Sequence, residues 1–140
     1  MIQKLWVYPL KSGAAVPVDT ITLGALGLTG DREYLLTDTD GRFLSARADP
    51  VIGQIGFDGV AFHRGQQRAP AAIFDSGLAH APVSIWKREQ PAHRADDATN
   101  AWFSALLGKP AVLWRLVPDS ALHFGDSQPV MVLNQATADA

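Results

Sequence analysis

The sequence of 140 residues contains no cysteine, little charge and no long apolar run. Without cysteine, the chain itself can form no disulfide, Cys-ligated zinc site, iron–sulfur cluster or thiol nucleophile. Charged residues make up 19% and the formal net charge is −2, so the chain lacks the basic face that nonspecific binding to nucleic acid requires. No segment approaches the roughly 20 apolar residues of a membrane-spanning helix. These absences favour a soluble cytoplasmic protein that binds neither nucleic acid nor a membrane.

What the chain does contain is the composition of a globular domain. Apolar residues account for 47% of the sequence, which at this length is sufficient for a hydrophobic core. Short apolar stretches are separated by turns rich in Gly, Pro and Asp, a pattern typical of β-structure. We therefore expect a mainly β fold, a small partly closed β-barrel with one short α-helix. The expected strands are residues 2–8, 16–23, 33–37, 42–46, 51–57, 60–63, 71–74, 83–87, 111–117 and 129–133.

One segment has the spacing of a helix. Apolar residues recur at three- and four-residue intervals between residues 98 and 106. Asp96 or Asp97 precedes them as a candidate N-cap, and Gly108 follows them as a candidate C-cap. These signals predict a helix near residues 97–107.

Glycine pairs with aspartate at two turns. Residues 38–41 (DTDG) and residues 58–59 (DG) predict hairpins between the strands on either side of them. The glycine-rich stretch at residues 24–30 is expected to be a turn-rich loop, and the polar stretch at residues 63–70 (HRGQQRAP) an exposed loop.

The residue types of catalytic and metal sites form no pattern. His63, His80, His93 and His123 lack the spacing of metal ligands. No serine lies in the motif of a nucleophile elbow. The sequence therefore assigns neither a catalytic residue nor a metal ligand.

Basic residues beside turns are the pattern that can carry a function. Lys11 and Ser12 lie in YPLKSG (residues 8–13), directly after the point where Pro9 interrupts strand pairing. Arg32 follows the glycine-rich stretch, and Arg47 follows a hairpin strand. An ammonium, a hydroxyl and a guanidinium fork all bind phosphate oxygens, and loops at one end of a β scaffold can bring them together.

The alternative is that these basic residues are separate solvated side chains. In that case Arg32 pairs with its neighbour Asp31 or Glu33 and contributes to no site. Spacing alone leaves both interpretations open.

Three stretches of the sequence resemble the N-terminal β-barrel domain of MOSC proteins. They are WVYPLKSG (6–13), LGALGLTGDREYLLTDTDGRFLSARADP (23–50) and FGDSQPVMVLNQAT (124–137). The likeness is to two-part MOSC enzymes, which include the bacterial YcbX-type proteins and the mitochondrial amidoxime-reducing component. Residues 1–122 are expected to be this N-terminal domain, and residues 123–140 the start of a MOSC core domain that is cut short.

The resemblance implies an oxidoreductase that uses the molybdenum cofactor, a molybdopterin, to reduce N-hydroxylated compounds. In this family, residues at the positions of Lys11, Ser12 and Arg32 contact the phosphate of the cofactor, and Arg47 matches a position with a supporting role. The implied partners are the C-terminal MOSC core domain and, as electron donor, a ferredoxin-like domain or a separate redox protein.

Two departures from the family pattern affect this expectation. Gly13 stands where family members often carry cysteine. The cysteine that ligates molybdenum lies in the family's following domain, so we expect this chain alone to hold the cofactor weakly at most and to be inactive. The alternative function is a non-enzymatic β-barrel module that binds an anion or carrier, or docks to another protein.

Overall fold

The computed structural model describes residues 2–24, 27–74, 81–85, 88–117 and 132; for residues 81, 82, 84, 85, 88 and 90 it describes the backbone alone. Within this part the chain is mainly β, with one α-helix, α1 (Asp97–Leu107), and a 3-10 helix, η1 (Pro50–Gln54). The strands are β1 (Leu5–Val7), β2 (Val16–Val18), β3 (Leu23–Gly24), β4 (Gly27–Leu28), β5 (Tyr34–Thr37), β6 (Gly56–Phe57), β7 (Phe62–Arg64), β8 (Gln67–Arg68), β9 (Ala81–Ile85), β10 (Arg88–Arg94) and β11 (Val112–Leu116).

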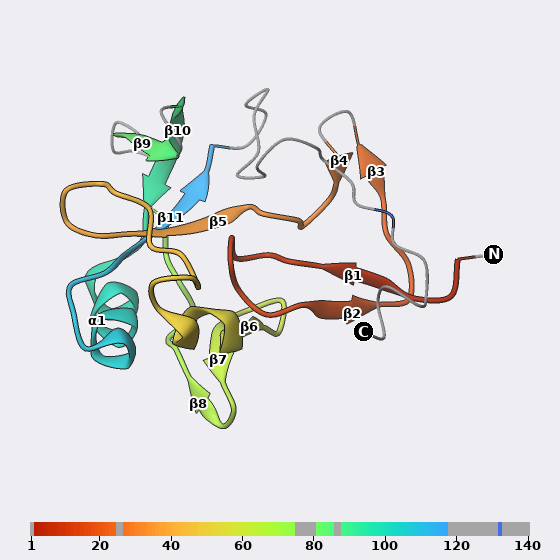
Figure 1. The fold of residues 1–140 in the computed structure, drawn as a ribbon, viewed down its shortest axis with the longest axis horizontal. Helices are drawn as coiled ribbons and strands as arrows, with labels where there is room; N and C mark the ends of the chain where they lie inside the picture. The colour runs from red at the N-terminus through yellow and green to blue at the C-terminus, as the bar shows by residue number, and fades with distance from the viewer. Residues whose placement is uncertain (1, 25–26, 75–80, 86–87, 118–131, 133–140) are drawn as a thin grey trace.

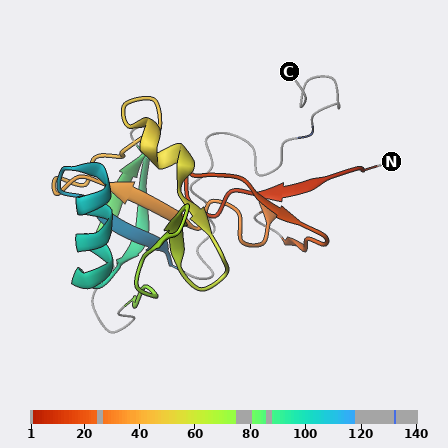
Figure 2. The same ribbon diagram turned by 90° about the horizontal axis from the view of Figure 1, so that it is seen from below.

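The described strands form four antiparallel sheets. The largest has the order β5-β11-β10-β9, the next is β6-β7-β8, and the hairpins β1-β2 and β3-β4 complete the set. Figures 1 and 2 show α1 at one end of the molecule and β1 to β4 at the other. The prediction of a mainly β fold with one helix is confirmed, and the described sheets are not closed into a barrel.

The predicted helix is confirmed together with its caps. The Asp96 carboxylate accepts a hydrogen bond from the Thr99 N–H (3.1 Å), so Asp96 and not Asp97 is the N-cap. Gly108 ends the helix with φ 67°, a left-handed conformation that glycine adopts without strain, and its N–H donates to the Ser104 carbonyl.

An aromatic core joins α1 to the sheets. Tyr34 of β5 packs against Phe57 (5.4 Å between ring centroids) and Phe62 (5.1 Å). Phe62 in turn contacts Phe103 of α1 at 5.4 Å. The aliphatic members of this cluster that are at most 1% exposed are Leu10, Leu36, Ile52, Ile55, Ala95 and Leu113.

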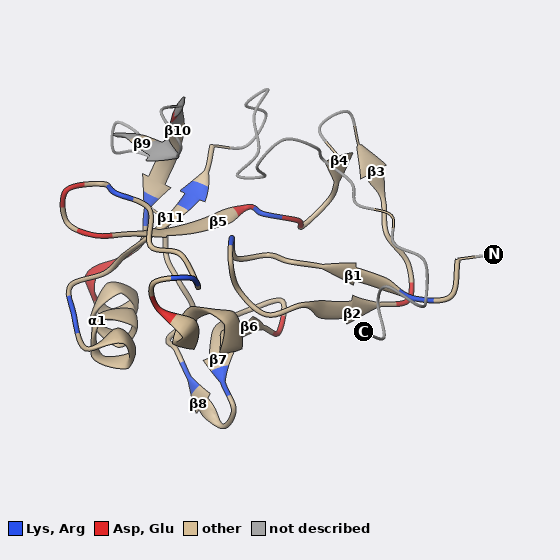
Figure 3. Ribbon diagram, in the orientation of Figure 1, with Lys and Arg blue, Asp and Glu red and all other residues tan. Residues whose placement is uncertain are grey.

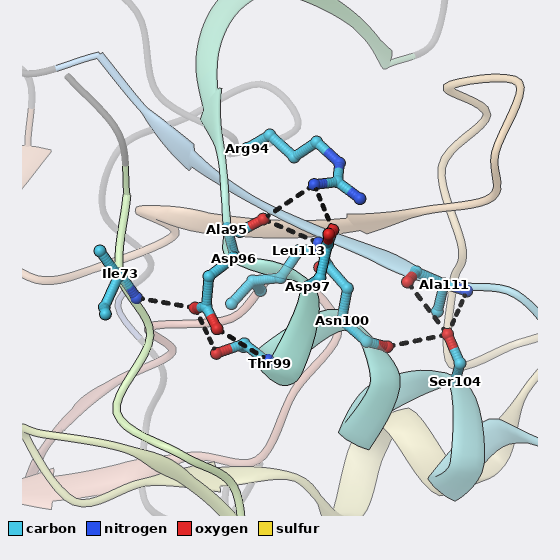
Figure 4. Close-up of polar contacts among 10 residues, drawn as sticks. All are labelled: Ile73, Arg94, Ala95, Asp96, Asp97, Thr99, Asn100, Ser104, Ala111 and Leu113. Atoms are coloured by element: carbon cyan, nitrogen blue, oxygen red, sulfur yellow. Dashed lines mark hydrogen bonds and ion pairs between the residues drawn. The ribbon is translucent and has the colours of Figure 1, made fainter. Parts of the chain in front are cut away.

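A polar network fixes α1 against β11 (Figure 4). The buried Asn100 donates from Nδ2 to the Ala95 carbonyl and accepts from the Leu113 N–H, both at 2.8 Å. The Ser104 hydroxyl donates to the Asn100 carbonyl (2.8 Å) and accepts from the Ala111 N–H (2.9 Å). These bonds satisfy buried backbone groups where the helix meets the strand.

Residues 51–57 are not the strand that the sequence predicted. Most of this range belongs to η1, and only Gly56–Phe57 is a strand, β6. Ile52 and Ile55 are both buried and lie three residues apart, so they align on one side of a 3-10 turn. Pro50 begins η1, since its fixed φ suits the first turn of a helix.

The sequence did not predict β10, the longest of the described strands, which is polar and contains a proline. It lies between β9 and β11, where Pro91 faces Pro82 of β9. The β10–β11 ladder begins only at Ala92, so the missing N–H of Pro91 interrupts no bond in that ladder.

Smaller differences concern hairpins. Residues 63–70 are in part the β7–β8 hairpin rather than a loop, and residues 24–30 contain the β3–β4 pair. Residues 42–46 form the predicted hairpin through an isolated Thr37–Phe43 bridge, the Leu44 N–H bond to the Leu36 carbonyl and the Asp38 N–H bond to the Arg42 carbonyl. The strand predicted at 129–133 lies outside the described residues, apart from Val132.

Candidate functional site

The segment that follows β1 runs alongside the segment that opens β5. The Arg32 N–H donates to the Tyr8 carbonyl (2.7 Å), and the Tyr34 N–H donates to the Pro9 carbonyl (3.0 Å). The Lys11 N–H returns a bond to the Tyr34 carbonyl (2.9 Å). Pro9 has no N–H to donate, but it still accepts, so pairing continues past it. The loops that carry Lys11 and Arg32 are therefore neighbours.

Two of the predicted site residues have an unusual backbone conformation. Among the described residues, only Ser12 (φ 65°) and Arg32 (φ 51°) are non-glycine residues with positive φ. This left-handed conformation costs an L-residue about 1–2 kcal/mol. Strain of this kind persists where the surrounding structure imposes it, and it concentrates at functional sites.

The loop of Arg47 also reaches this region. A Cβ placed on Gly53 of η1 would lie 3.8 Å from the Ala46 Cβ and 3.9 Å from the Ser12 carbonyl oxygen. Ala46 and Ser12 thus approach the same point from two different loops. Arg47, next to Ala46, is exposed to solvent. The backbone brings the loops of all four predicted residues into one region.

The side chains of Lys11 and Ser12 differ in their surroundings. Lys11 is buried, 6% exposed, with its ammonium 5.4 Å from the centroid of the Phe43 ring, at the distance of a cation–π contact. Ser12 is half-buried, and no residue in the described part of the chain hydrogen-bonds its hydroxyl. The Lys11 ammonium is thus a buried positive charge, and the Ser12 hydroxyl is a half-buried hydrogen-bond donor.

Arg32 is held by its neighbours. Its guanidinium forms an ion pair with the Asp31 carboxylate, as the alternative interpretation of the sequence expected. Its Cζ also lies 5.0 Å from the centroid of the Tyr8 ring. The Arg32 side chain is 27% exposed, so it is partly accessible to solvent.

Arg115 is a basic residue of this region that sequence reasoning missed. It lies on β11 opposite Tyr34, and its guanidinium is 3.6 Å from the Glu33 carboxylate. Burial raises the pKa of the Tyr34 hydroxyl, an effect that the nearby Arg115 charge opposes. Nothing in the sequence indicates this proximity, because it depends on the register of β11 against β5.

Gly13 is required by the turn that carries Ser12. A Cβ at this position would lie 2.8 Å from the Leu10 Cβ and 3.1 Å from the Ile55 carbonyl oxygen. Both are closer than ordinary packing allows, and one is backbone that cannot rotate away. In this chain the turn therefore disfavours any side chain at position 13.

The described residues contain no group of three His, Cys, Asp or Glu side chains that could hold a metal ion. His63 lies on β7 and His93 on β10, while His80 and His123 are outside the described residues. Strands β1 to β4 carry no charged residue, whereas charged residues lie at both ends of β5, next to α1 and on β7, β8 and β11 (Figure 3). In the described part of the chain, α1, with 11 residues, is the longest helix and is too short to cross a bilayer.

The sequence matches a known family and several curated proteins. Residues 1–110 match the family described as the MOSC N-terminal beta barrel domain. A molybdenum cofactor sulfurase of Oryza sativa subsp. japonica is 27% identical over 81% of this chain and 15% of the relative. Mitochondrial amidoxime reducing component 2 of Homo sapiens is 40% identical over 36% of this chain and 16% of the relative. The same protein of Bos taurus is 24% identical over 97% of this chain and 48% of the relative.

The chain thus spans less than half the length of these curated relatives. Among solved structures, the solution structure of a protein from Bordetella bronchiseptica matches with a TM-score of 0.50 and 17% identity. The match covers 69% of this chain and 81% of that protein. At this identity the likeness concerns the fold alone.

Proposed function

The chain belongs to the MOSC N-terminal beta barrel domain family, and on that basis we propose that its loops bind the phosphate of a molybdenum cofactor. The proposed site consists of Lys11, Ser12 and Arg32, with Arg47 in a supporting role at the exposed edge. The whole protein is then an oxidoreductase that reduces N-hydroxylated compounds. The observation that carries the proposal is the backbone pairing between residues 8–11 and 32–34, which makes the two principal loops neighbours.

The donor set fits a phosphate group. Lys11 offers a compact charge in a buried setting, where an ionic contact is stronger than in water. Arg32 offers a planar fork, and Ser12 a hydroxyl without a protein hydrogen bond in the described part of the chain. Ser12 and Arg32 adopt a left-handed backbone conformation that glycine would adopt without strain. The presence of a serine and an arginine at these positions supports a functional role for their side chains.

The role of these residues in the whole protein is binding and orientation. When bound, the cofactor supplies the redox chemistry at its metal, and the protein holds it in place. We propose that a C-terminal MOSC core domain, beginning near residue 123, completes the site, and that a ferredoxin-like domain or a separate redox protein donates electrons. The greater length of the curated relatives supports a further domain.

A cofactor-sulfurating enzyme is a second candidate for the whole protein. The rice relative named for that activity is 27% identical over 81% of this chain, against 24% over 97% for the bovine amidoxime reducing component. The two candidates share the proposed phosphate site and differ in the reaction. An assay of the full-length protein with an amidoxime and a two-electron donor separates them: reduction to the amidine and water supports the reductase.

The site itself is tested by a double variant of the full-length protein, Lys11→Ala with Arg32→Ala. Each substitution removes a charge-assisted contact worth about 1.5–3 kcal/mol, so cofactor affinity is expected to fall at least about a hundredfold. Molybdenum and pterin content per mole of purified protein measures the effect. The matched control, Arg68→Ala with Arg94→Ala, removes two surface arginines from β8 and β10. Unchanged cofactor content in the Lys11/Arg32 variant refutes the site.

Loss of folding would also lower the cofactor content of the alanine variant. A second pair of substitutions at the same two positions is therefore chosen to preserve the fold. Lys11→Met keeps most of the buried stem, and Arg32→Asn suits a left-handed backbone. This pair is expected to keep the unfolding midpoint near that of the original protein and still lose the cofactor.

A further inference from the structure

The Asp31 carboxylate connects the two loops of the proposed site. One of its oxygens, Oδ1, accepts the Tyr8 N–H at 2.7 Å, and the other, Oδ2, accepts the Arg32 guanidinium. The Asp31 side chain is only 5% exposed, against 27% for Arg32. A carboxylate in this position is shielded from solvent and fixed by backbone, so it is a rigid support for the guanidinium beside it.

Tyr8 restrains the same arginine from two further directions. Its carbonyl accepts the Arg32 N–H at 2.7 Å, and its ring lies beneath the guanidinium, 5.0 Å from Cζ. Arg32 is therefore held at its backbone, at one edge and on one face. A long side chain restrained in this way has already lost most of the rotamer freedom that a flexible arginine would lose on binding a ligand.

We propose that Asp31 and the Tyr8 ring are positioning residues, which hold the Arg32 guanidinium in place to receive a phosphate monoester. This inference rests on the proposed function. A guanidinium has five N–H donors, and the bond to Asp31 uses a donor on NH1, so donors remain for phosphate oxygens. The Tyr8 ring lies against the guanidinium and limits its movement on that side, so the anion is proposed to bind the donors that Tyr8 and Asp31 leave open.

Positioning and simple charge effects predict opposite results for Asp31→Asn. This substitution keeps an oxygen that can accept the Tyr8 N–H, but it removes a negative charge beside the anion site. If charge alone mattered, phosphate would bind more tightly. If Asp31 positions Arg32, phosphate binds about five- to tenfold more weakly, because the guanidinium must be ordered on binding.

The experiment measures the dissociation constant of inorganic phosphate for the 140-residue chain by NMR titration, with the Arg32 Nε–Hε signal as a second readout. Asp31→Asn is expected to weaken binding and to merge that signal with those of mobile arginines. The control Asp40→Asn makes the same charge change at the side chain that pairs with Arg42, and should leave both readouts unchanged. Equal or tighter binding by Asp31→Asn overturns the proposal.

The tyrosine gives an independent arm in case Asp31→Asn does not fold. Tyr8→Phe keeps the ring and should retain phosphate affinity, whereas Tyr8→Leu removes the stacking face and should weaken binding several-fold. Equal affinities of these two variants contradict the role of the ring. Absence of phosphate binding by the unchanged chain overturns an anion site formed by these loops, and the positioning with it, while binding that Asp31→Asn leaves intact overturns only the positioning.

Discussion

The contact between α1 and β11 and the loops around Lys11 and Arg32 use polar groups in different ways. At α1 the buried Asn100 and Ser104 bond to backbone groups of Ala95, Leu113 and Ala111. In the loops, two residues adopt strained conformations, and the Ser12 hydroxyl bonds to no described residue. In the first region the polar side chains bond to backbone groups, while the second combines strained backbone with a hydroxyl that bonds to no described residue.

This contrast separates stability from function. Substitutions at α1 should change the free energy of unfolding and leave anion affinity alone. Substitution of the polar residues in the loops should instead change anion affinity. A glycine at a loop residue with positive φ should increase the free energy of unfolding, because it relieves backbone strain. Four substitutions test the contrast, from the largest expected effect on stability to the smallest.

Asn100→Ala is expected to destabilise the protein most, by about 3 kcal/mol. It removes two hydrogen bonds and leaves the buried Leu113 N–H without its partner. Urea unfolding followed by circular dichroism measures the change. Ala101→Ser, on the exposed side of the same helix, is the control and should stay within about 0.5 kcal/mol. A loss below about 1 kcal/mol for Asn100→Ala would show that the network contributes little.

Gly13→Ala should destabilise the Ser12 turn by about 1–3 kcal/mol, because its Cβ would lie 2.8 Å from the Leu10 Cβ. Gly53→Ala is the matched control, since the nearest atom to its Cβ is 3.8 Å away and nothing must move. The two variants are compared by thermal unfolding. Similar midpoints for both would contradict the packing of the turn.

Asp96→Asn should change how stability depends on pH, with an effect of about 1 kcal/mol or less. Burial of Asp96 favours the neutral acid, but hydrogen bonds from the Ile73 N–H and from Thr99 outweigh it, so the pKa is lowered. A lowered pKa stabilises the folded state above the ordinary aspartate pKa of about 3.9, and this contribution is lost as pH falls. Urea unfolding from pH 7 to pH 3 should give a shallower decline for Asp96→Asn; parallel curves would be inconsistent with the shift.

Ser12→Gly should have the smallest effect and the opposite sign, a gain of up to about 1 kcal/mol. Glycine adopts φ 65° without strain, although it also gives the unfolded chain more freedom. Ser45→Gly, at a residue without positive φ, is the control and should lose stability. Destabilisation of Ser12→Gly by more than its control would mean that the serine stabilises its turn.

The sequence predicts local features of the fold better than long-range ones. The helix was predictable because Asp96, Gly108 and the apolar spacing act within one segment. Ile52 and Ile55 misled the prediction because a spacing of three residues suits both an irregular strand and a 3-10 turn. Strand β10 was missed because its partners β9 and β11, and not its own composition, determine it.

The candidate site was predicted from family resemblance, and its local arrangement was not. Lys11, Ser12, Arg32 and Arg47 could be named from motifs, but their spatial relation depends on pairing between residues 8–11 and 32–34. The spacing alone could not distinguish an Arg32 that is merely paired with Asp31 from one that Asp31 also positions. The approach of Arg115 to Glu33 depends on sheet register, which no motif encodes.

The central claim is that Lys11, Ser12 and Arg32 form one anion site. An NMR titration of the chain with inorganic phosphate tests it directly. The account predicts that the amide signals of residues 11–13 and 32–33 shift together with a single dissociation constant, while those of α1 do not move. Shifts confined to one loop, or separate dissociation constants for the two loops, would contradict it.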